Sequence, residues 1–272
     1  MSQIPRIIHQ TWKNDQIPEH WKESHENWKK FHPDWEYKLW TDEACREYIE
    51  ERHPDFLSTY DSFPHKIQRI DAVRPFWMKD FGGVYSDLDL APQEPIDKYL
   101  SNDCDVYLVE SANTGHYTNM FMISKPGVPL WDTYIEEMKK PKPYWAVTKH
   151  FEVMTTTGPL ALDRVARNYK GVVGHLPKVL FNPTGLKDDL CLQTDSVIKV
   201  LPGSSWHSWD STVIVFIFKH STLLICLVVL IAILIIVLLV YYCYKYNRVS
   251  NTLKRIRTEC YSVCEAAFTI KT

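Results

Sequence analysis

DFGGVYSDLDL, residues 80–90, is the segment from which the rest of this sequence is best interpreted. Its two glycines are a strong turn signal, and Val84 and Leu88 are among the apolar residues that favour a short buried strand after them. Asp87 and Asp89 lie two residues apart, so on a strand both carboxylates would point to the same face. Neighbouring carboxylates repel each other unless a cation lies between them. Oxygen ligands suit a hard divalent ion such as Mn²⁺ or Mg²⁺, which can also bind a diphosphate.

The alternative for an Asp-x-Asp pattern is a polar strand end or turn, because such short patterns recur by chance. The surrounding sequence must decide between the two. Strand patterns cover residues 4–10, 35–40, 84–90, 106–109, 120–124, 172–175 and 197–200. Helical spacing of apolar residues covers residues 19–31, 41–52, 66–81, 128–139 and 158–168. We expect Pro75 to kink or restart the helix over 66–81, because proline lacks the amide donor.

This alternation of strands and helices predicts an α/β fold with a mostly parallel central sheet. Ligands of such folds bind beyond the carboxyl ends of the strands. The two aspartates close a predicted strand, so they are expected at that edge of the sheet.

A second feature is the uncharged apolar run over residues 223–244, which is long enough to cross a bilayer as a helix. It predicts four parts: a catalytic domain over 1–210, a juxtamembrane linker over 211–222, a transmembrane helix over 223–244 and a basic tail over 245–272. A buried core helix is the alternative for the apolar run, but the run is apolar on every face.

Charge is distributed unevenly along the chain. The formal net charge is −2, yet the tail contains six Lys or Arg against two Glu, and Lys219 adds one more positive charge. Residues 1–210 therefore carry about −7, which argues against nucleic acid as a partner. The seven cysteines form no Cys-x-x-Cys zinc pattern.

The basic tail favours the cytosolic side of a membrane by the positive-inside rule, which places the catalytic domain in the lumen of a Golgi- or ER-type compartment. Residues 1–5 show no basic and apolar signal peptide before the first strand, and this conflicts with a lumenal domain. The alternative is a tail anchor with the domain in the cytosol. We expect the single-pass, lumenal arrangement.

Four motifs in order give the sequence a resemblance to a known family. They are IPRIIHQTWK (4–13), RIDAVRPFWMKDFGGVYSDLDL (69–90), TTGP (156–159) and GSSWHSWD (203–210). Together they resemble the glycosyltransferases of the initiating α-1,6-mannosyltransferase type, family 32, and most closely the inositol-phosphorylceramide mannosyltransferases. The resemblance implies a GT-A-like nucleotide-diphospho-sugar transferase fold and a Mn²⁺-dependent reaction that retains anomeric configuration.

The resemblance also implies roles for individual residues. Asp89 would bind the metal, and Asp87 would bind the metal, the nucleotide ribose or both. Asp71 and Arg74 lie one helical turn apart and would hold hydroxyls of the donor sugar. The alternative interpretation of these two residues is an ordinary surface ion pair, since such pairs are common on helices. Pro75 departs from the family's aliphatic pattern, and we expect it to bend the helix that carries this pair.

Further candidates come from the other motifs. Tyr85 would meet the sugar or phosphate, and Trp12 would stack on the nucleotide base; core packing is the alternative for both. His207 would complete the metal site, since imidazole binds Mn²⁺ alongside carboxylates. Asn119 and Asp189 are weaker candidates for contact with sugar or acceptor.

The expected function is therefore transfer of a sugar from a sugar nucleotide to a lipid or glycan acceptor at a membrane. GDP-mannose is the expected donor, and inositol-phosphorylceramide or a glycan the expected acceptor; UDP-galactose and UDP-N-acetylglucosamine are alternative donors. A phosphatase with an aspartyl nucleophile is disfavoured, because Ala91 stands where that class needs Thr or Val. A non-catalytic, membrane-tethered sugar-nucleotide-binding protein is the remaining alternative.

Overall fold

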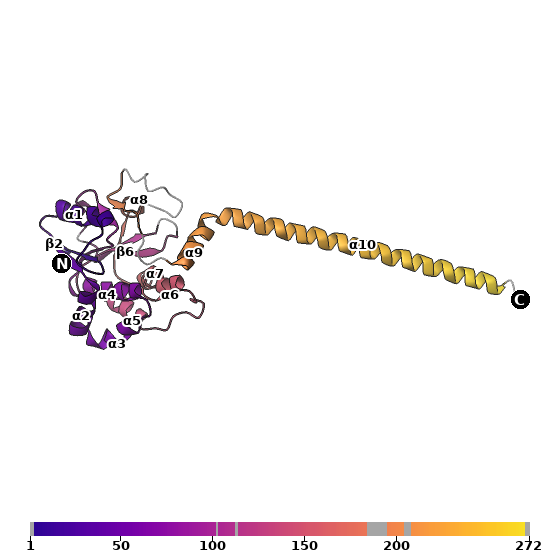
Figure 1. Cartoon of the computed structure of the whole chain (residues 1–272), viewed down its shortest axis with the longest axis horizontal. Coiled ribbons are helices and arrows are strands. Elements are labelled where there is room, and N and C mark those ends of the chain that lie inside the picture. Colours follow the sequence, from indigo (N-terminus) through magenta and orange to yellow (C-terminus); the bar gives the residue numbers. More distant parts are fainter. Residues whose placement is uncertain (1–2, 102, 112–113, 184–194, 204–207, 270–272) are drawn as a thin grey trace. The chain divides into compact units, whose positions relative to one another are not determined.

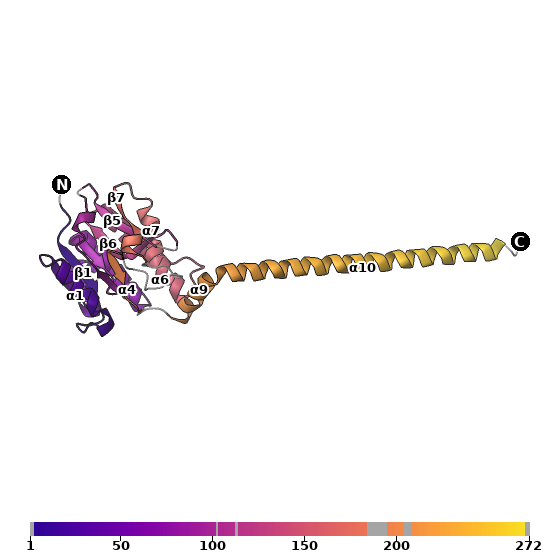
Figure 2. The same cartoon turned by 90° about the horizontal axis from the view of Figure 1, so that it is seen from above.

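The computed structural model describes residues 3–101, 103–111, 114–183, 195–203 and 208–269, with side chains as far as residue 257 (Figures 1 and 2). The chain divides into two compact units, Met1–Val215 and Phe216–Thr272. Within the described residues the first unit contains every strand, and the second is helical.

A six-stranded sheet forms the centre of the first unit, in the order β2-β1-β3-β6-β5-β7. Its strands are β1 (Ile7–Thr11), β2 (Glu36–Trp40), β3 (Gly83–Ser86), β5 (Val106–Glu110), β6 (Tyr117–Ser124) and β7 (Val173–Leu176). β6 runs antiparallel to both of its neighbours, β3 and β5, and the other pairings of the sheet are parallel. The expected α/β fold with a mostly parallel sheet is confirmed.

Helices cover both faces of this sheet (Figure 1). On one face lie α2 (Asp42–Arg52), α3 (Pro54–Ser62), α4 (Lys66–Asp80), α5 (Pro129–Met138) and α7 (Pro159–Ala166). On the other face lie α1 (Lys22–Phe31) and α8 (Lys178–Phe181). Successive strand residues point to opposite faces, so Leu108 packs in the first core and Val109 in the second. This burial of both faces explains the apolar strands of the sequence.

The segment from Gly83 to Leu90 differs from its expected form. β3 ends at Ser86, and Asp87 to Asp89 form a turn in which the Leu90 amide donates to the Asp87 carbonyl at 3.1 Å. The chain then enters β4 (Leu90–Pro92), which pairs with β8 (Ile198–Val200) in a separate two-stranded sheet. The prediction that both aspartates lie on one strand is wrong, because the chain changes sheets between them.

α4 also differs in one respect from its expected form. It is one continuous helix from Lys66 to Asp80 with Pro75 inside it, so the expected restart does not occur. Pro75 is buried, and so are its neighbours Arg74, Phe76 and Trp77. Packing on both sides of the proline holds the helix together although one amide donor is missing.

The other predicted elements are found within a few residues of their expected bounds. The remaining helical segments are the 3₁₀ turns η1 (Glu19–Trp21) and η2 (Asp97–Tyr99), and the helices α6 (Lys149–Thr156), α9 (Trp209–Lys219) and α10 (Ser221–Thr269). Residues Ser221–Arg257 of α10 form the one helix among the described residues that is long and apolar enough to cross a membrane. The predicted span over 223–244 lies inside it.

Candidate active site

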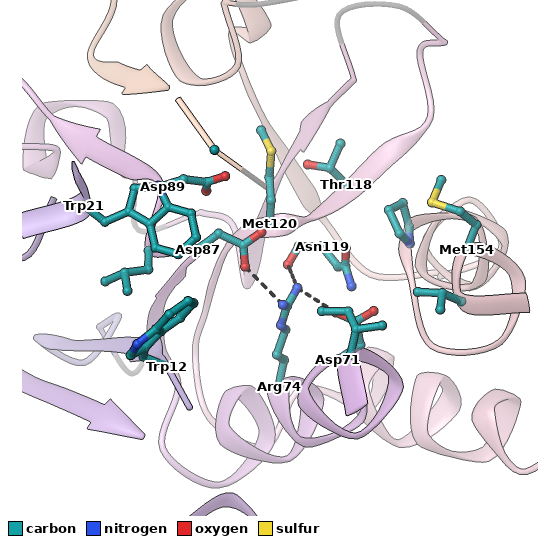
Figure 3. Close-up of a pocket in the computed structure, with 15 residues that line it drawn as sticks. Trp12, Trp21, Asp71, Arg74, Asp87, Asp89, Thr118, Asn119, Met120 and Met154 are labelled. Carbon is teal, nitrogen blue, oxygen red and sulfur yellow. Dashed lines mark hydrogen bonds and ion pairs between the residues drawn. The ribbon is translucent and has the colours of Figure 1, made fainter. Parts of the chain in front are cut away.

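A hollow of about 300 Å³ opens at the edge of the sheet where β1 and β3 end (Figure 3). β6 runs the opposite way, so its first half reaches the same edge. The lining residues come from eight parts of the chain: Trp12, Trp21, Ile67, Asp71, Arg74, Asp87, Leu88, Asp89, Thr118, Asn119, Met120, Val153, Met154, Pro159 and Gly203. The site therefore lies beyond the carboxyl ends of parallel strands, as expected for this fold class.

Arg74 of α4 is the centre of the polar network in this hollow (Figure 3). Its guanidinium lies 3.0 Å from Asp71 Oδ1 and 3.1 Å from Asp87 Oδ1, and it donates to the Asn119 carbonyl at 3.0 Å. Arg74 and Asp71 are each only 4% exposed. The interpretation of Asp71 and Arg74 as a surface ion pair is therefore wrong: they form a buried pair that also holds Asp87.

Tyr85 of β3 supports the same carboxylate from the other side. Its hydroxyl donates to Asp87 Oδ1 at 2.6 Å, and its ring lies under the Arg74 guanidinium at 4.5 Å. Gln10 of β1 donates to the Asp87 carbonyl at 3.3 Å. Asp87 is thus fixed through both its side chain and its backbone, although its side chain is still 31% exposed to the hollow.

The carboxyl groups of the hollow are poorly solvated. Burial raises the pKa of Asp71 to about 7, against the opposing charge of Arg74. Burial and then the charge of Asp87 raise the pKa of Asp89 to about 7. Burial also raises the pKa of Asp87, again opposed by Arg74. Arg74 thus pairs with two of the three carboxyls, Asp71 and Asp87, and Asp89 has no ion pair with it.

Asp87 and Asp89 line the same hollow, and their oxygen atoms suit a hard divalent cation such as Mn²⁺ or Mg²⁺. Asp89 is the freer of the two, because Asp87 is already held by Arg74 and Tyr85. Within the described ranges no cluster of three or more His, Cys, Asp or Glu side chains could hold a metal. The predicted third ligand, His207, lies outside the described residues, as does Asp189.

Trp12 lies between two hollows. It lines the first and, with Ile67, also a second of about 550 Å³. The other residues of the second hollow are mainly polar or basic: Thr11, Lys13, Asp42, Pro64, His65, Lys66, Ile70 and Lys149. The Trp12 ring packs edge-on against Trp21 at 5.0 Å, and its buried indole N–H has no hydrogen-bond partner in the described structure. An unpaired buried donor beside a hollow is suited to a ligand oxygen.

Sequence reasoning missed several residues of the site. Trp21, Thr118, Met120 and Met154 line the first hollow, but no motif distinguishes them from core residues. Asn119, by contrast, was a predicted candidate: it lines the hollow, and its backbone carbonyl accepts from Arg74.

The known proteins to which this chain is similar are glycosyltransferases. The family described as "Glycosyltransferase sugar-binding region containing DXD motif" matches residues 18–106, which include Asp71, Arg74, Asp87 and Asp89 but not Trp12. Over 229 residues the chain is 33% identical to mannosyl phosphorylinositol ceramide synthase SUR1 of Saccharomyces cerevisiae; the match covers 83% of this chain and 57% of that protein.

A second relative is inositol phosphoceramide mannosyltransferase 1 of Schizosaccharomyces pombe. It is 30% identical over 228 residues, covering 81% of this chain and 68% of the relative. Among solved structures the chain is similar to the PaToxG glycosyltransferase, with a TM-score of 0.46 and 16% identity over 61% of this chain and 69% of the other. The chain thus spans about three fifths of the length of the curated relatives it matches.

Proposed function

The chain belongs to the family of DXD glycosyltransferases that includes the inositol phosphoceramide mannosyltransferases, and from this membership we propose that it transfers mannose from GDP-mannose to a lipid of the inositol phosphoceramide class. The observation that carries the proposal is the network of Asp71, Arg74 and Asp87, which shares one hollow with Asp89. These four residues lie within the region that matches the family.

In the proposed complex Asp89 and Asp87 hold a divalent cation, with Mn²⁺ or Mg²⁺ suited to their oxygen atoms. When bound, such an ion offsets the negative charge of a departing nucleoside diphosphate. Arg74 keeps Asp87 in one orientation, so that its second oxygen stays directed at the hollow. His207 is proposed as a further ligand from its motif alone.

We propose that Asp71 binds the sugar. Its carboxylate is held by Arg74 on one side and lines the hollow on the other, so it can accept hydrogen bonds from sugar hydroxyls. Displacement with retention follows if the acceptor hydroxyl approaches from the same face as the leaving diphosphate, whose oxygen then takes the proton. Asp71, Asp87 and Asp89 then serve to bind and orient the donor.

The second hollow supports a guanine donor. Trp12 offers a ring to a base, and Asp42, at the start of α2, places a carboxylate in the same hollow. Guanine presents N1–H and the N2 amino group side by side, so one carboxylate can accept both hydrogen bonds. Uracil presents a single N–H between two carbonyl oxygens, which would repel a carboxylate. Asp42 therefore favours GDP-mannose over UDP-galactose and UDP-N-acetylglucosamine.

We propose the acceptor from the family to which the chain belongs and from its predicted membrane span. Two relatives are named for mannosylation of inositol phosphoceramide, and α10 would hold the chain at the bilayer that contains such a lipid. Tethering raises the effective concentration of enzyme at that surface. We place the catalytic unit on the lumenal side of a Golgi-type membrane, because the basic tail favours the cytosol.

A panel of sugar nucleotides tests the proposal. The full chain in detergent or vesicles is incubated with Mn²⁺ and GDP-mannose, UDP-galactose or UDP-N-acetylglucosamine, with and without inositol phosphoceramide. We expect GDP release with GDP-mannose, loss of activity with a chelator, recovery with Mn²⁺, and mannosyl lipid when the acceptor is present. Donor binding without turnover for any acceptor would instead support a binding protein, and release of inorganic phosphate a phosphatase.

A further inference from the structure

Four large side chains are exposed on two segments at one place in the first unit. Tyr144 is 94% exposed, Val147 79% and Trp145 48%, all on the connection between α5 and α6, and Trp209 at the start of α9 is 75% exposed. We call these four residues the aromatic surface. Single exposed apolar residues are normal in proteins, but a group with three aromatic rings marks an interaction site.

Buried polar contacts hold the two segments together. The His150 amide donates to Asp210 Oδ2 at 2.7 Å, and His150 Nδ1 lies 3.1 Å from Ser211 Oγ. Asp210 and Ser211 are buried, at 3% and 0% exposed. The end of the connection, where α6 begins, and the start of α9 are therefore held side by side.

The composition of this surface fits the interface of a lipid bilayer. Tyrosine and tryptophan are enriched at the boundary between headgroups and hydrocarbon, and lysines commonly flank them. Lysines at 139, 140, 142 and 149 flank the segment. Lys139, Lys140 and Lys142 pair with Glu136, Glu137 and Glu152, so insertion of aromatic rings, more than net charge, would supply the attraction.

A bilayer is also within reach of this surface. The first unit ends at Val215, and the apolar helix begins at Ser221. Even fully extended, the residues between them span no more than about 20 Å. Because Asp210 and Ser211 are bound to α6, the aromatic surface lies close to the point where the chain leaves the first unit.

We propose that the aromatic surface rests in the headgroup layer of the bilayer that the chain's own apolar helix spans. α6 connects this surface to the donor site: Lys149 in its first turn lines the second hollow, and Val153 and Met154 line the first. If the proposed function holds, a lipid headgroup at this surface lies about two helical turns from the first hollow, where the donor sugar would bind. The surface would then both orient the catalytic unit and deliver the acceptor.

The test measures lipid contact directly and needs no catalysis. An environment-sensitive fluorescent amino acid is incorporated at Val147 in one sample and at Val172 in another, in the full chain reconstituted in nanodiscs. Val172 is a matched control, because it is an exposed valine of the same unit outside the aromatic surface. We expect a blue-shifted emission at position 147 that doxyl-labelled lipids quench, and little of either effect at 172. Equal quenching at both positions would overturn the proposal.

A second measurement separates this proposal from the proposed reaction. The variant Tyr144→Ser with Val147→Ser is compared with Val172→Ser with Val179→Ser, an exposed valine pair elsewhere. We expect the first pair alone to lower kcat/KM for lipid acceptor in vesicles, by about tenfold, while donor hydrolysis is unchanged. Normal transfer by that variant would overturn the role in acceptor delivery. Absence of transfer in all chains, with quenching at 147 intact, would contradict the reaction but not the membrane contact.

Discussion

Arg74 contacts three oxygen acceptors at once, from Asp71, Asp87 and the Asn119 carbonyl. Burial alone would lower the pKa of its guanidinium, but the charges of Asp87 and Asp71 outweigh burial and raise it. Arg74 therefore fixes the orientation of both carboxylates and also balances their charge, because the planar guanidinium presents its donors in set directions. Asp89 has no ion pair of this kind among the described residues, and that leaves its carboxylate available to a cation.

Replacement of Asp89 tests this assignment. We expect Asp89→Asn to lower kcat by about 100-fold or more, since it removes a carboxylate that would stabilise the leaving group through the metal. Asp34→Asn, at an exposed aspartate remote in sequence, is the control and should keep full activity. Transfer by Asp89→Asn at the wild-type rate with Mn²⁺ present would show the metal assignment to be wrong.

The same variant has a predicted effect on stability. The folded-state pKa of Asp89 is raised to about 7, so the folded protein holds this proton more tightly than the unfolded chain. Stability from this group is present at acidic pH and is lost as pH rises from about 4 through 7. We expect Asp89→Asn to unfold at a higher denaturant concentration than wild type at pH 8 in a chelator. A lower midpoint would contradict this.

Asp42 is expected to select the donor base. Asp42→Asn should lower kcat/KM for GDP-mannose by about tenfold to a hundredfold and raise relative use of a uridine donor, because an amide can donate to a uracil carbonyl. Glu43→Gln, at the next and exposed position, is the matched control. The change is measured by how strongly GDP and UDP each inhibit donor hydrolysis. If the ratio of the two inhibition constants is unaltered, Asp42 is excluded from base recognition.

At the scale of single residues, much of the site could be predicted from the sequence. Five of the predicted residues line the first hollow: Trp12, Asp71, Arg74, Asp87 and Asp89. Tyr85 does not line the hollow; its hydroxyl donates a hydrogen bond to Asp87. Trp21 could not be predicted, because its place depends on Pro202, whose carbonyl accepts from its indole 181 residues later in the chain.

The turn between α4 and β3 explains why two glycines precede the site. Gly82 and Gly83 have φ of +65° and +87°, and a Cβ at Gly83 would lie 2.4 Å from the Ile7 carbonyl oxygen of the neighbouring strand. That close approach sets β1 beside β3, and so places Trp12 beside Asp87.

Gly83→Ala should therefore destabilise the fold by more than about 3 kcal/mol, the sum of backbone strain and a steric clash. Gly127→Ala is the control: its φ is +71°, but a Cβ there meets nothing within 4 Å. That change should cost about 1–2 kcal/mol. Denaturation followed by tryptophan fluorescence measures both, and equal losses would rule out the clash as the cause.

His9 links three elements and gives a pH dependence. It receives a hydrogen bond from Trp40 at Nδ1 (3.1 Å), and its Nε2 lies 3.1 Å from the Gly82 carbonyl, so the neutral ring satisfies both partners. Burial lowers its pKa to about 3, despite the Gly82 carbonyl, with a smaller lowering contribution from Lys38. The unfolded chain thus binds a proton at a higher pH than the folded protein, and stability falls as pH drops below about 6.5.

We expect wild type to lose up to about 1.4 kcal/mol per pH unit more than His9→Gln between pH 6 and pH 4. The variant is less stable at neutral pH, so the slopes, not the absolute values, are compared. Denaturant titrations at four pH values give both slopes. Parallel slopes would mean that His9 does not titrate on unfolding.

The elements themselves were predictable where periodicity was strong, as in α4 and β5. The turn at Asp87 was not, because a period of two assumes that the strand continues. The chain leaves the main sheet after Ser86 and pairs with β8, which is over one hundred residues away in sequence. Only that distant partner determines where the strand ends.

At the scale of the whole chain, the apolar helix and the basic tail predict orientation. The uncharged run of residues 223–244 would span about 33 Å as a helix, enough for the hydrocarbon core. Tyrosines at 241, 242 and 244 end the run and fit an interfacial belt. Five of the tail's six basic residues follow within 245–257, where positive charge most strongly favours the cytosol.

Protease protection tests this orientation. In sealed microsomes a tag placed after Thr272 should be cleaved by added protease, while the first unit stays protected until detergent is added. Replacing the five basic residues of 245–257 with Gln should reduce the protected fraction, because it removes the charge bias that sets orientation. The same number of Lys→Gln changes at exposed sites in the first unit is the control. A protected tag and a digested first unit would reverse the topology, and the lipid acceptor would then have to be presented on the cytosolic leaflet.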